Sequence, residues 1–305
     1  MKTTSVFSTN VINRAVYAGA VLFMVCDGRA QNLFVSTPAD NGIYEFARDG
    51  TETSFIPGAP GAAGLAFDAM GNLYTSDFFA GSIYQITPEG DLSTLFTPSE
   101  FSQPWGLAFN SAGNLFATDT RNGDIDEITP GGVESAFASD LVFPYGLAFN
   151  SVGNLFVADE TGNIYEFAPG GARSIFASSY NFDDIGGMAF DGAGNLYVVN
   201  GNQGTVYRIT PSSVVSVFVS GVGLPGGLAF DNEGNLYVAD PEGGTNGDGC
   251  IYKIAPDGDK TVFASGLNDP VELAFAPVPE PSVLALQAFA GLGVFSMPFL
   301  LRRKA

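Results

Sequence analysis

Short apolar segments alternate with turn residues along most of the chain, and the alternation itself repeats. Residues 106–119 read GLAFNSAGNLFATD, and residues 146–159 read GLAFNSVGNLFVAD. Each repeat holds four segments of strand length: one like GLAF, one like NLYVAD, an aromatic one such as IYQI, and a closing one such as SIFA. The turn sequences D/N-x-x-G-N and P-E-G or P-G-G separate them. The pattern therefore predicts four short antiparallel strands per repeat.

The spacing of the repeats predicts how these strands are assembled. The NL(Y/F) core recurs at Asn32, Asn72, Asn114, Asn154, Asn195 and Asn235, with spacings of 40, 42, 40, 41 and 40 residues, and Gly precedes the Asn in all but the first repeat. A period near 40 with strand-like content is typical of a β-propeller with one four-stranded blade per repeat. The first repeat lacks its GLAF segment, whereas an ELAFA segment at 272–276 stands alone. We therefore expect an all-β, six-bladed β-propeller over 31–277, closed by a C-terminal strand (272–276) that pairs with the first blade.

Composition and charge narrow the classes of partner. The chain has 39 glycines and 27 phenylalanines, and only 14% of its residues are charged, as suits a strand-rich globular protein. Residues 31–282 hold six basic and 31 acidic residues, a net charge of −25. Such a surface repels nucleic acid and attracts cations, so we expect no nucleic-acid partner. Cys250 is the only cysteine in this segment, so packing alone must hold the fold.

The N-terminal 30 residues have the pattern of a signal peptide. Lys2 and Arg14 precede the apolar run AVYAGAVLFMV, and Gly28 and Ala30 are small residues before Gln31. This order predicts cleavage after Ala30. The alternative is a lipoprotein site at Cys26.

The C-terminal 28 residues, 278–305, have a second targeting pattern. The sequence VPEPS is followed by an apolar stretch at 283–301, which is about long enough to span a bilayer as a single transmembrane helix, and then by RRKA. This order, which covers 279–304, resembles the PEP-CTERM sorting signal of Gram-negative bacteria. The resemblance implies export across the inner membrane, transient anchoring by the C-terminal helix, processing by an exosortase-type enzyme, and display at the cell surface or outside it beside exopolysaccharide. The alternative is an ordinary single-span anchor. Both place 31–277 outside the cytoplasm.

The repeat resembles the NHL and gluconolactonase-like propeller superfamily over about 31–277. The resemblance rests on the order GLAFD, GNLYVAD, IYKI and FA, and the Gly-His and Trp-Asp signatures of WD repeats are absent. In that superfamily, the turns after the second strands and the connectors into the first strands share one rim around a central channel. The polar residues at the ends of the second strands are expected to cap turns; they are Asp77, Asp119, Asp159, Asn200 and Asp240.

Departures from the repeat mark candidate ligands of a metal. The chain has no histidine, which excludes a Ser-His-Asp triad, a His-ligated zinc site and a His-dependent lyase. Glu272 stands where the other repeats have Gly, and Asn200 replaces Asp. Gluconolactonase-like enzymes hold a divalent cation with Glu, Asn and Asp, so the resemblance suggests a Ca²⁺ site of Glu272, Asn200 and Asp240. The early Glu-Gly-Pro motif of those enzymes is missing.

Two aromatic residues on the same rim suggest a different ligand. Trp105 and Tyr145 occupy equivalent places in PWGLAF and PYGLAF, so we expect them to be neighbours. Aromatic faces beside carboxylates bind sugars or cations, and Asp183 and Asp184 on the next connector would join this site. The alternative is that both rings pack over a blade interface.

Three functional hypotheses follow. The first is a non-enzymatic binding module for carbohydrate or an envelope protein, with or without calcium. The second is a metal-dependent lactonase or related hydrolase, and the third is a structural spacer without a ligand.

Overall fold

A computed structural model of the chain describes residues 14–17, 20–23, 31–59, 61–96, 103–179, 185–244 and 248–277. The predicted sorting signal (278–305), Asp183 and Asp184 lie outside these ranges. Most of the predicted signal peptide does too, apart from β1 (Arg14–Tyr17) and β2 (Ala20–Phe23), which pair as an antiparallel hairpin. Nowhere in the described ranges is there a helix with the length and apolar character needed to span a bilayer.

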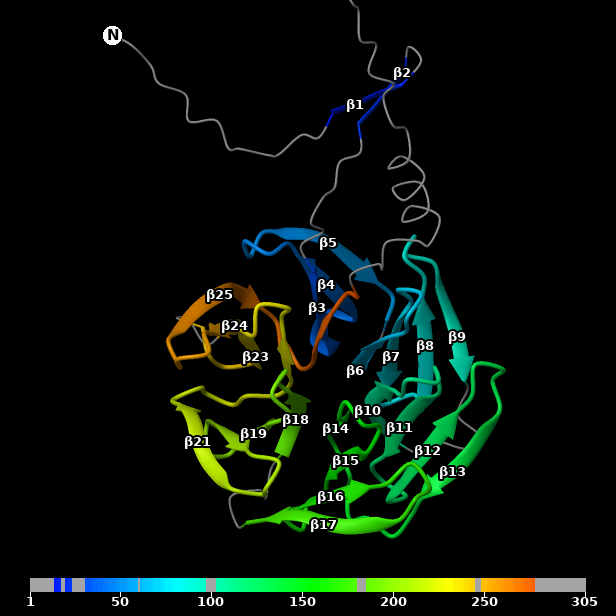
Figure 1. The fold of residues 1–305 in the computed structure, drawn as a ribbon, viewed down its shortest axis with the longest axis vertical. Helices are drawn as coiled ribbons and strands as arrows, with labels where there is room; N and C mark the ends of the chain where they lie inside the picture. The colour runs from blue at the N-terminus through cyan, green and yellow to red at the C-terminus, as the bar shows by residue number, and fades with distance from the viewer. Residues whose placement is uncertain are drawn as a thin grey trace, which may run out of the picture.

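The strands of 31–277 form a ring of blades (Figure 1). Within the described residues there are six four-stranded antiparallel sheets, as predicted, and each runs outward from the channel in chain order except the first. Blade 1 consists of β26 (Leu273–Phe275), β3 (Leu33–Thr37), β4 (Gly42–Phe46) and β5 (Glu52–Pro57). Blade 2 consists of β6 (Ala62–Phe67), β7 (Leu73–Asp77), β8 (Ser82–Ile86) and β9 (Leu92–Phe96). Blade 3 consists of β10 (Pro104–Phe109), β11 (Leu115–Asp119), β12 (Asp124–Ile128) and β13 (Glu134–Ala138).

Blades 4 to 6 repeat the same arrangement. Blade 4 consists of β14 (Leu147–Phe149), β15 (Leu155–Ala158), β16 (Asn163–Phe167) and β17 (Arg173–Ser178). Blade 5 consists of β18 (Ile185–Phe190), β19 (Leu196–Asn200), β20 (Thr205–Ile209) and β21 (Val215–Ser220). Blade 6 consists of β22 (Leu228–Phe230), β23 (Leu236–Asp240), β24 (Gly249–Ile254) and β25 (Lys260–Leu267). A short 3-10 helix, η1 (Pro38–Asp40), links β3 to β4.

The ring closes as the sequence predicted. Strand β26 pairs antiparallel with β3, with Leu273 opposite Val35. Backbone hydrogen bonds continue the pairing on both sides of β26, from the Ser36 amide to the Glu272 carbonyl and from the Ala276 amide to the Asn32 carbonyl, each 3.0 Å long. Residues 31–277 thus contain every strand partner of the ring, and β1 and β2 pair only with each other. We therefore expect this segment to fold on its own.

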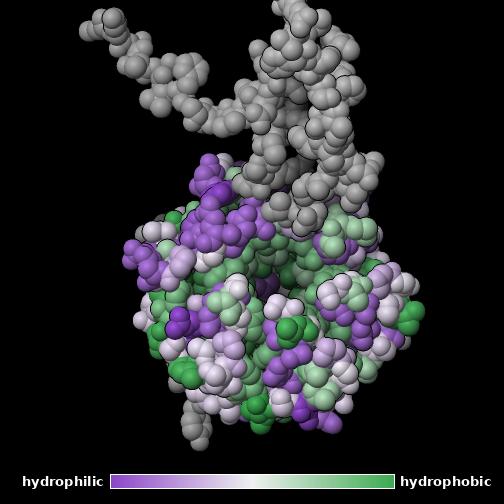
Figure 2. Space-filling view, viewed as in Figure 1, coloured by the Kyte–Doolittle hydropathy of each residue, from purple (hydrophilic) through white to green (hydrophobic). Residues whose placement is uncertain are grey.

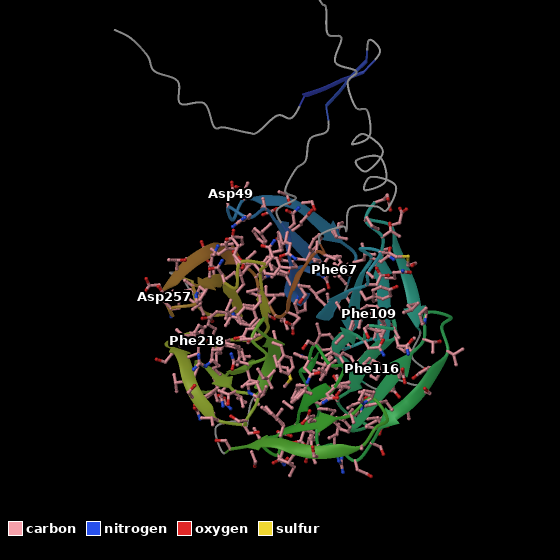
Figure 3. All side chains as sticks on the ribbon, in the orientation of Figure 1. Asp49, Phe67, Phe109, Phe116, Phe218 and Asp257 are labelled. Atoms are coloured by element: carbon pink, nitrogen blue, oxygen red, sulfur yellow. The ribbon has the colours of Figure 1, made fainter. Side chains whose placement is uncertain are left out.

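The core consists of apolar layers between neighbouring blades, not within them. In every layer an aromatic residue of a second strand meets the Phe of the next first strand edge-on, with ring centroids 4.9–5.1 Å apart. The pairs are Phe34–Phe67, Tyr74–Phe109, Phe116–Phe149, Phe156–Phe190, Tyr197–Phe230 and Tyr237–Phe275. Phe67, Phe109 and Phe116 follow one another around the ring in Figure 3. Edge-to-face geometry suits the quadrupoles of the rings, and one blade supplies only half of each pair, so the repeat must continue until the ring closes.

Glycine precedes the Leu-Ala-Phe segment of the first strands in blades 2 and 3 because neighbouring blades approach each other closely there. A Cβ atom on Gly64 would lie 2.0 Å from the carbonyl oxygen of Trp105, and one on Gly106 would lie 2.5 Å from that of Tyr145. Both distances are far below van der Waals contact, so a side chain would force the blades apart. Glycine therefore brings the first strands together around a narrow channel.

Candidate functional site: the channel mouth and its aromatic rim

The acidic residues that end the second strands hold the rim together. Asp77 accepts hydrogen bonds from the amides of Phe79 and Ala80 (3.0 and 2.8 Å), so it caps the turn into the third strand as predicted. Asp159 accepts one from its own turn, at Thr161 (3.1 Å), and one from the connector, at Val142 (3.3 Å). The repeated carboxylate thus joins the turn to the connector.

Two of the three predicted metal ligands belong to this capping set. Asp240 is fully buried and accepts amide hydrogen bonds from Gly223 (2.6 Å), Leu224 (3.1 Å) and Glu242 (3.1 Å). Asn200 is also fully buried, and its Oδ1 accepts the amide hydrogen of Gln203 at 2.8 Å. Oδ1 of Asp240 accepts two of these hydrogen bonds and Oδ2 accepts one, so Oδ2 keeps a lone pair for a further partner.

The third predicted ligand, Glu272, lies apart from this set in the central channel. The channel encloses a cavity of about 90 Å³, and Glu272 is the only charged residue among the described residues that line it. The walls are otherwise apolar or glycine; their side chains are Leu65, Leu107, Leu147, Met188, Leu228 and Leu273. Figure 2 shows the hollow at the centre of the ring and the hydrophobic residues around it. The described residues hold no group of three His, Cys, Asp or Glu side chains arranged for a metal ion, so a calcium site of Glu272, Asn200 and Asp240 remains a prediction.

The environment of Glu272 changes its acidity. Burial raises the pKa of Glu272 to about 7, although the backbone amides of Leu273 and Leu228 donate to the carboxylate and act in the opposite direction. The amide of Leu273 lies 3.1 Å from Oε1. A Cβ atom on Gly227 would lie 2.2 Å from the same oxygen, so glycine in the neighbouring blade makes room for the carboxyl group. A carboxyl that titrates near neutral pH could act as a general acid or base.

The aromatic pair of the sequence prediction is formed and is part of a larger cluster. The rings of Trp105 and Tyr145 are neighbours in T-shaped contact, with centroids 5.7 Å apart. Phe78 packs on the other side of Trp105 (5.2 Å) and against Phe79 (5.4 Å). Phe79 is 83% exposed, and the other three rings are half-buried. We call these four residues the aromatic rim.

Sequence reasoning missed Phe78 and Phe79. The signal was present, because Phe78 and Phe79 follow directly on a second strand, where no other repeat has an aromatic residue. The aromatic rim is confined to blades 2 to 4, where Trp105 and Tyr145 directly precede Gly106 and Gly146 of the channel wall. The residues equivalent to Trp105 and Tyr145 in the other blades are smaller: Ala63, Gly186, Gly226 and Val271. The contribution of Asp183 and Asp184 lies outside the described residues.

Comparison with known proteins bears on the fold. No protein-family model and no curated protein matches the chain. Among solved structures, a nidogen/laminin complex contains a chain with a TM-score of 0.69 and 20% identity, over 82% of this chain and 99% of that one. Virginiamycin B lyase from Staphylococcus aureus has a TM-score of 0.56 and 19% identity, over 67% of this chain and 70% of that one. A putative gluconolactonase has a TM-score of 0.58 and 18% identity, over 70% of this chain and 84% of that one. The chain is thus similar in fold to a binding protein and to enzymes, all of them β-propellers like this one.

Proposed function

We propose that this protein is an exported, non-enzymatic binding module whose aromatic rim binds a neutral carbohydrate chain. The observation that carries the proposal is the row of Phe79, Phe78, Trp105 and Tyr145, which presents partly exposed rings at the mouth of a rigid ring. Large exposed aromatic residues on a scaffold are costly unless they serve binding. Flat rings of this kind stack on the apolar faces of sugars.

The charge of the chain favours a neutral polymer over an anionic one. A net charge of −25 over 31–282 repels uronic acids and other polyanions. Exposed amides on this rim can bind sugar hydroxyls; Asn122, for example, is exposed on the turn that follows β11, where its side chain donates to Asp119. An envelope protein is the alternative partner, because exposed aromatic residues also form the centres of protein interfaces.

The two ends of the chain support a place outside the cytoplasm. Residues 1–30 have the features of a signal peptide, and 278–305 those of a PEP-CTERM signal. In this proposal, an exosortase-type enzyme acts on the C-terminal signal after transient anchoring of helix 283–301 in the inner membrane of a Gram-negative bacterium. The propeller then stays at the cell surface or joins the exopolysaccharide matrix.

A second function is favoured by the position of Glu272. A carboxyl group with a pKa of about 7 in an apolar channel could serve a hydrolase of the lactonase type. Such an enzyme would require a divalent cation such as Ca²⁺, with Asn200 and Asp240 as its further ligands beside Glu272.

The decisive experiment measures binding of residues 31–277 to neutral oligosaccharides and to the exopolysaccharide of the native host by calorimetry. Replacing Trp105 and Tyr145 together with Ala should weaken binding by at least about tenfold, about 1.4 kcal/mol. Met70→Ala is the control, because Met70 is 79% exposed on the turn between β6 and β7, at the other end of blade 2. Unchanged binding in the double variant would overturn the carbohydrate proposal.

The same preparation separates the alternatives. Capture of an envelope protein through Trp105 and Tyr145, without any glycan binding, would identify a protein partner. Hydrolysis of a lactone panel that EDTA and Glu272→Gln both abolish would establish the enzyme. A wild-type protein that binds and hydrolyses nothing would be a spacer.

A further inference from the structure

The outer strand of blade 5, β21, differs from the outer strands of the other blades. It is the last strand in the order β18-β19-β20-β21, and among the described residues no strand pairs with its outer edge. In Figure 1 it lies on the outer wall of the ring. Its sequence, VSVFVS, is rich in β-branched residues and contains no charge, proline or glycine. A strand of this kind is a ready template for further pairing.

Charged residues protect the equivalent strands. The residue that begins β17 is Arg173, and the one that begins β25 is Lys260, whereas β21 begins with Val215. Strands β5 and β13 begin with Glu52 and Glu134. Such charges on edge strands discourage pairing with another chain.

Strand β9 also contains no charged residue, but charged residues surround it. It follows Asp91 directly, and its blade carries four acidic residues and no basic one between 61 and 96. Blade 5, by contrast, has no net charge of its own: residues 185–220 hold one acidic residue, Asp191, and one basic residue, Arg208. The nearest charge from another blade is Lys260 of blade 6, which donates to the Gly221 carbonyl just after β21. No charged residue occurs between Arg208 and Asp231.

The exposed apolar side chains of this wall are valines, beside the exposed hydroxyl groups of Ser216 and Ser220. Val214, Val215 and Val217 are 58%, 37% and 59% exposed, respectively. Phe218, in contrast, turns inward and packs edge-on against Tyr197 at 5.0 Å, so it anchors the strand to its blade. The strand is therefore fixed in place while its valines face solvent.

We propose that two copies of this chain pair through the free edges of β21, antiparallel and strand to strand. Such a contact would satisfy the outward amide and carbonyl groups of β21 and cover its valines. The distribution of charge favours a second copy of the chain as the partner. Two copies with a net charge of −25 repel each other over most faces, but they repel least at blade 5, which has no net charge of its own. A basic partner would be drawn to the acidic blades instead. The contact lies on the wall, away from the aromatic rim, and is independent of the carbohydrate proposal.

Sedimentation velocity of residues 31–277 over a concentration series tests the pairing. Wild type should form a dimer, and Val217→Lys and Val217→Glu should each raise its dissociation constant by at least about tenfold. Variants of opposite sign are used because an effect of net charge alone would move them in opposite directions. Val262→Lys and Val262→Glu are the matched controls, since Val262 has the equivalent place in β25 and the same 59% exposure.

A second variant and a second readout keep the test independent of folding defects. Val215→Lys copies the residue that β25 carries at this place, so it should fold normally and remain monomeric. In hydrogen exchange, amides of 215–220 should gain protection on dimerisation in wild type and not in Val215→Lys. A wild type that stays monomeric at every concentration, or Val262 variants that weaken the dimer as much as the Val217 variants, would overturn the proposal.

Discussion

Every blade has one carboxylate beside the Asn that precedes its second strand, but this carboxylate comes from one of two places. The Asn side-chain amide donates to it over 2.6–2.8 Å in all six blades. Blades 2, 5 and 6 use an Asp at the end of the first strand, and blades 1, 3 and 4 use a Glu on the third strand; these are Asp68, Asp191, Asp231, Glu45, Glu127 and Glu166.

The neighbouring residues change with the source of the carboxylate. The second-strand aromatic residue is Tyr in the Asp blades and Phe in the Glu blades. In blade 2 the Tyr74 hydroxyl donates to Asp68 at 3.3 Å. The third strand of an Asp blade carries no second carboxylate, and in blade 6 Lys253 lies 3.9 Å from Asp231. Two carboxylates at this partly buried place would repel each other, so each blade keeps one.

This rule predicts a destabilising substitution and its rescue. Lys253→Glu puts a second carboxylate beside Asp231 and should lower the free energy of unfolding by about 1–3 kcal/mol. Adding Asp231→Asn and Tyr237→Phe gives blade 6 the residues of blade 4 and should recover most of the loss. Urea denaturation measures both. A triple variant no more stable than Lys253→Glu would refute the rule.

Glu272 makes stability depend on pH in a direction opposite to that of a salt-bridged acid. Its pKa rises from 4.5 to about 7 on folding, so the folded protein binds more protons than the unfolded chain between these values. Stability therefore falls as pH rises from about 4.5 to about 7, by up to about 3 kcal/mol from this group. Glu272→Gln should remove that fall: without calcium, the variant should gain stability over wild type at pH 8 and not at pH 4.5. Parallel stability profiles for the two proteins would show that Glu272 titrates normally.

At the scale of elements, hydroxyl groups on the second strands join three pairs of blades. The Ser76 hydroxyl accepts the Gly64 amide hydrogen of its own blade (2.9 Å) and donates to the Trp105 carbonyl of the next (2.6 Å). Thr118 makes the same two contacts in blade 3, and Ser36 makes them in blade 1, with the Glu272 amide and the Ala63 carbonyl. Blades 4, 5 and 6 have Ala158, Val199 and Ala239 at this place, and there the Gly187 and Gly227 amides of blades 5 and 6 donate directly to the next blade.

Two adjacent residues of β7 test this contact against a matched control. Ser76→Ala leaves a buried amide and carbonyl without a partner and should cost about 1–3 kcal/mol of unfolding free energy. Thr75 is equally buried, but its hydroxyl has no hydrogen-bond partner among the described residues. Thr75→Val should therefore be neutral or stabilising by up to about 1 kcal/mol. Equal losses in the two variants, measured by urea denaturation, would contradict the role of Ser76.

These contacts mark where sequence reasoning stopped. The period and turn residues predicted the blades, the closing strand and the capping role of residues such as Asp159, because these depend on local pattern and on counting. The partners of Ser76 and Glu272 lie in neighbouring blades, and the repeat shows which positions are equivalent without showing which atoms meet. Trp105 and Tyr145 were predicted as neighbours because they share one repeat position, whereas Phe78 reaches them from a different one.

At the scale of the whole molecule, the ring is closed by contacts between the two ends of its chain. Besides β26 and β3, Arg48 pairs with Glu233, and the Asn268 side chain donates to Asp40 at 3.0 Å. All of these are non-covalent. Unfolding can therefore begin by separation of blade 6 from blade 1, and a covalent link across the closure should stabilise the ring more than the same link inside a blade.

A pair of engineered disulfides tests this expectation. Val35 and Leu273 face each other across β3 and β26, and Leu65 and Thr75 are the equivalent pair in blade 2. When both members of a pair are replaced by cysteine, the first pair closes a loop of most of the ring and the second closes one hairpin. Loop entropy predicts stabilisation of about 5 kcal/mol and about 3 kcal/mol, respectively. Each oxidised protein is compared with its own reduced form in urea, which cancels the cost of the cysteine substitutions. If the closure opens first, the disulfide across the closure should also slow unfolding, whereas the hairpin disulfide should not; equal unfolding rates would mean that the ring opens elsewhere.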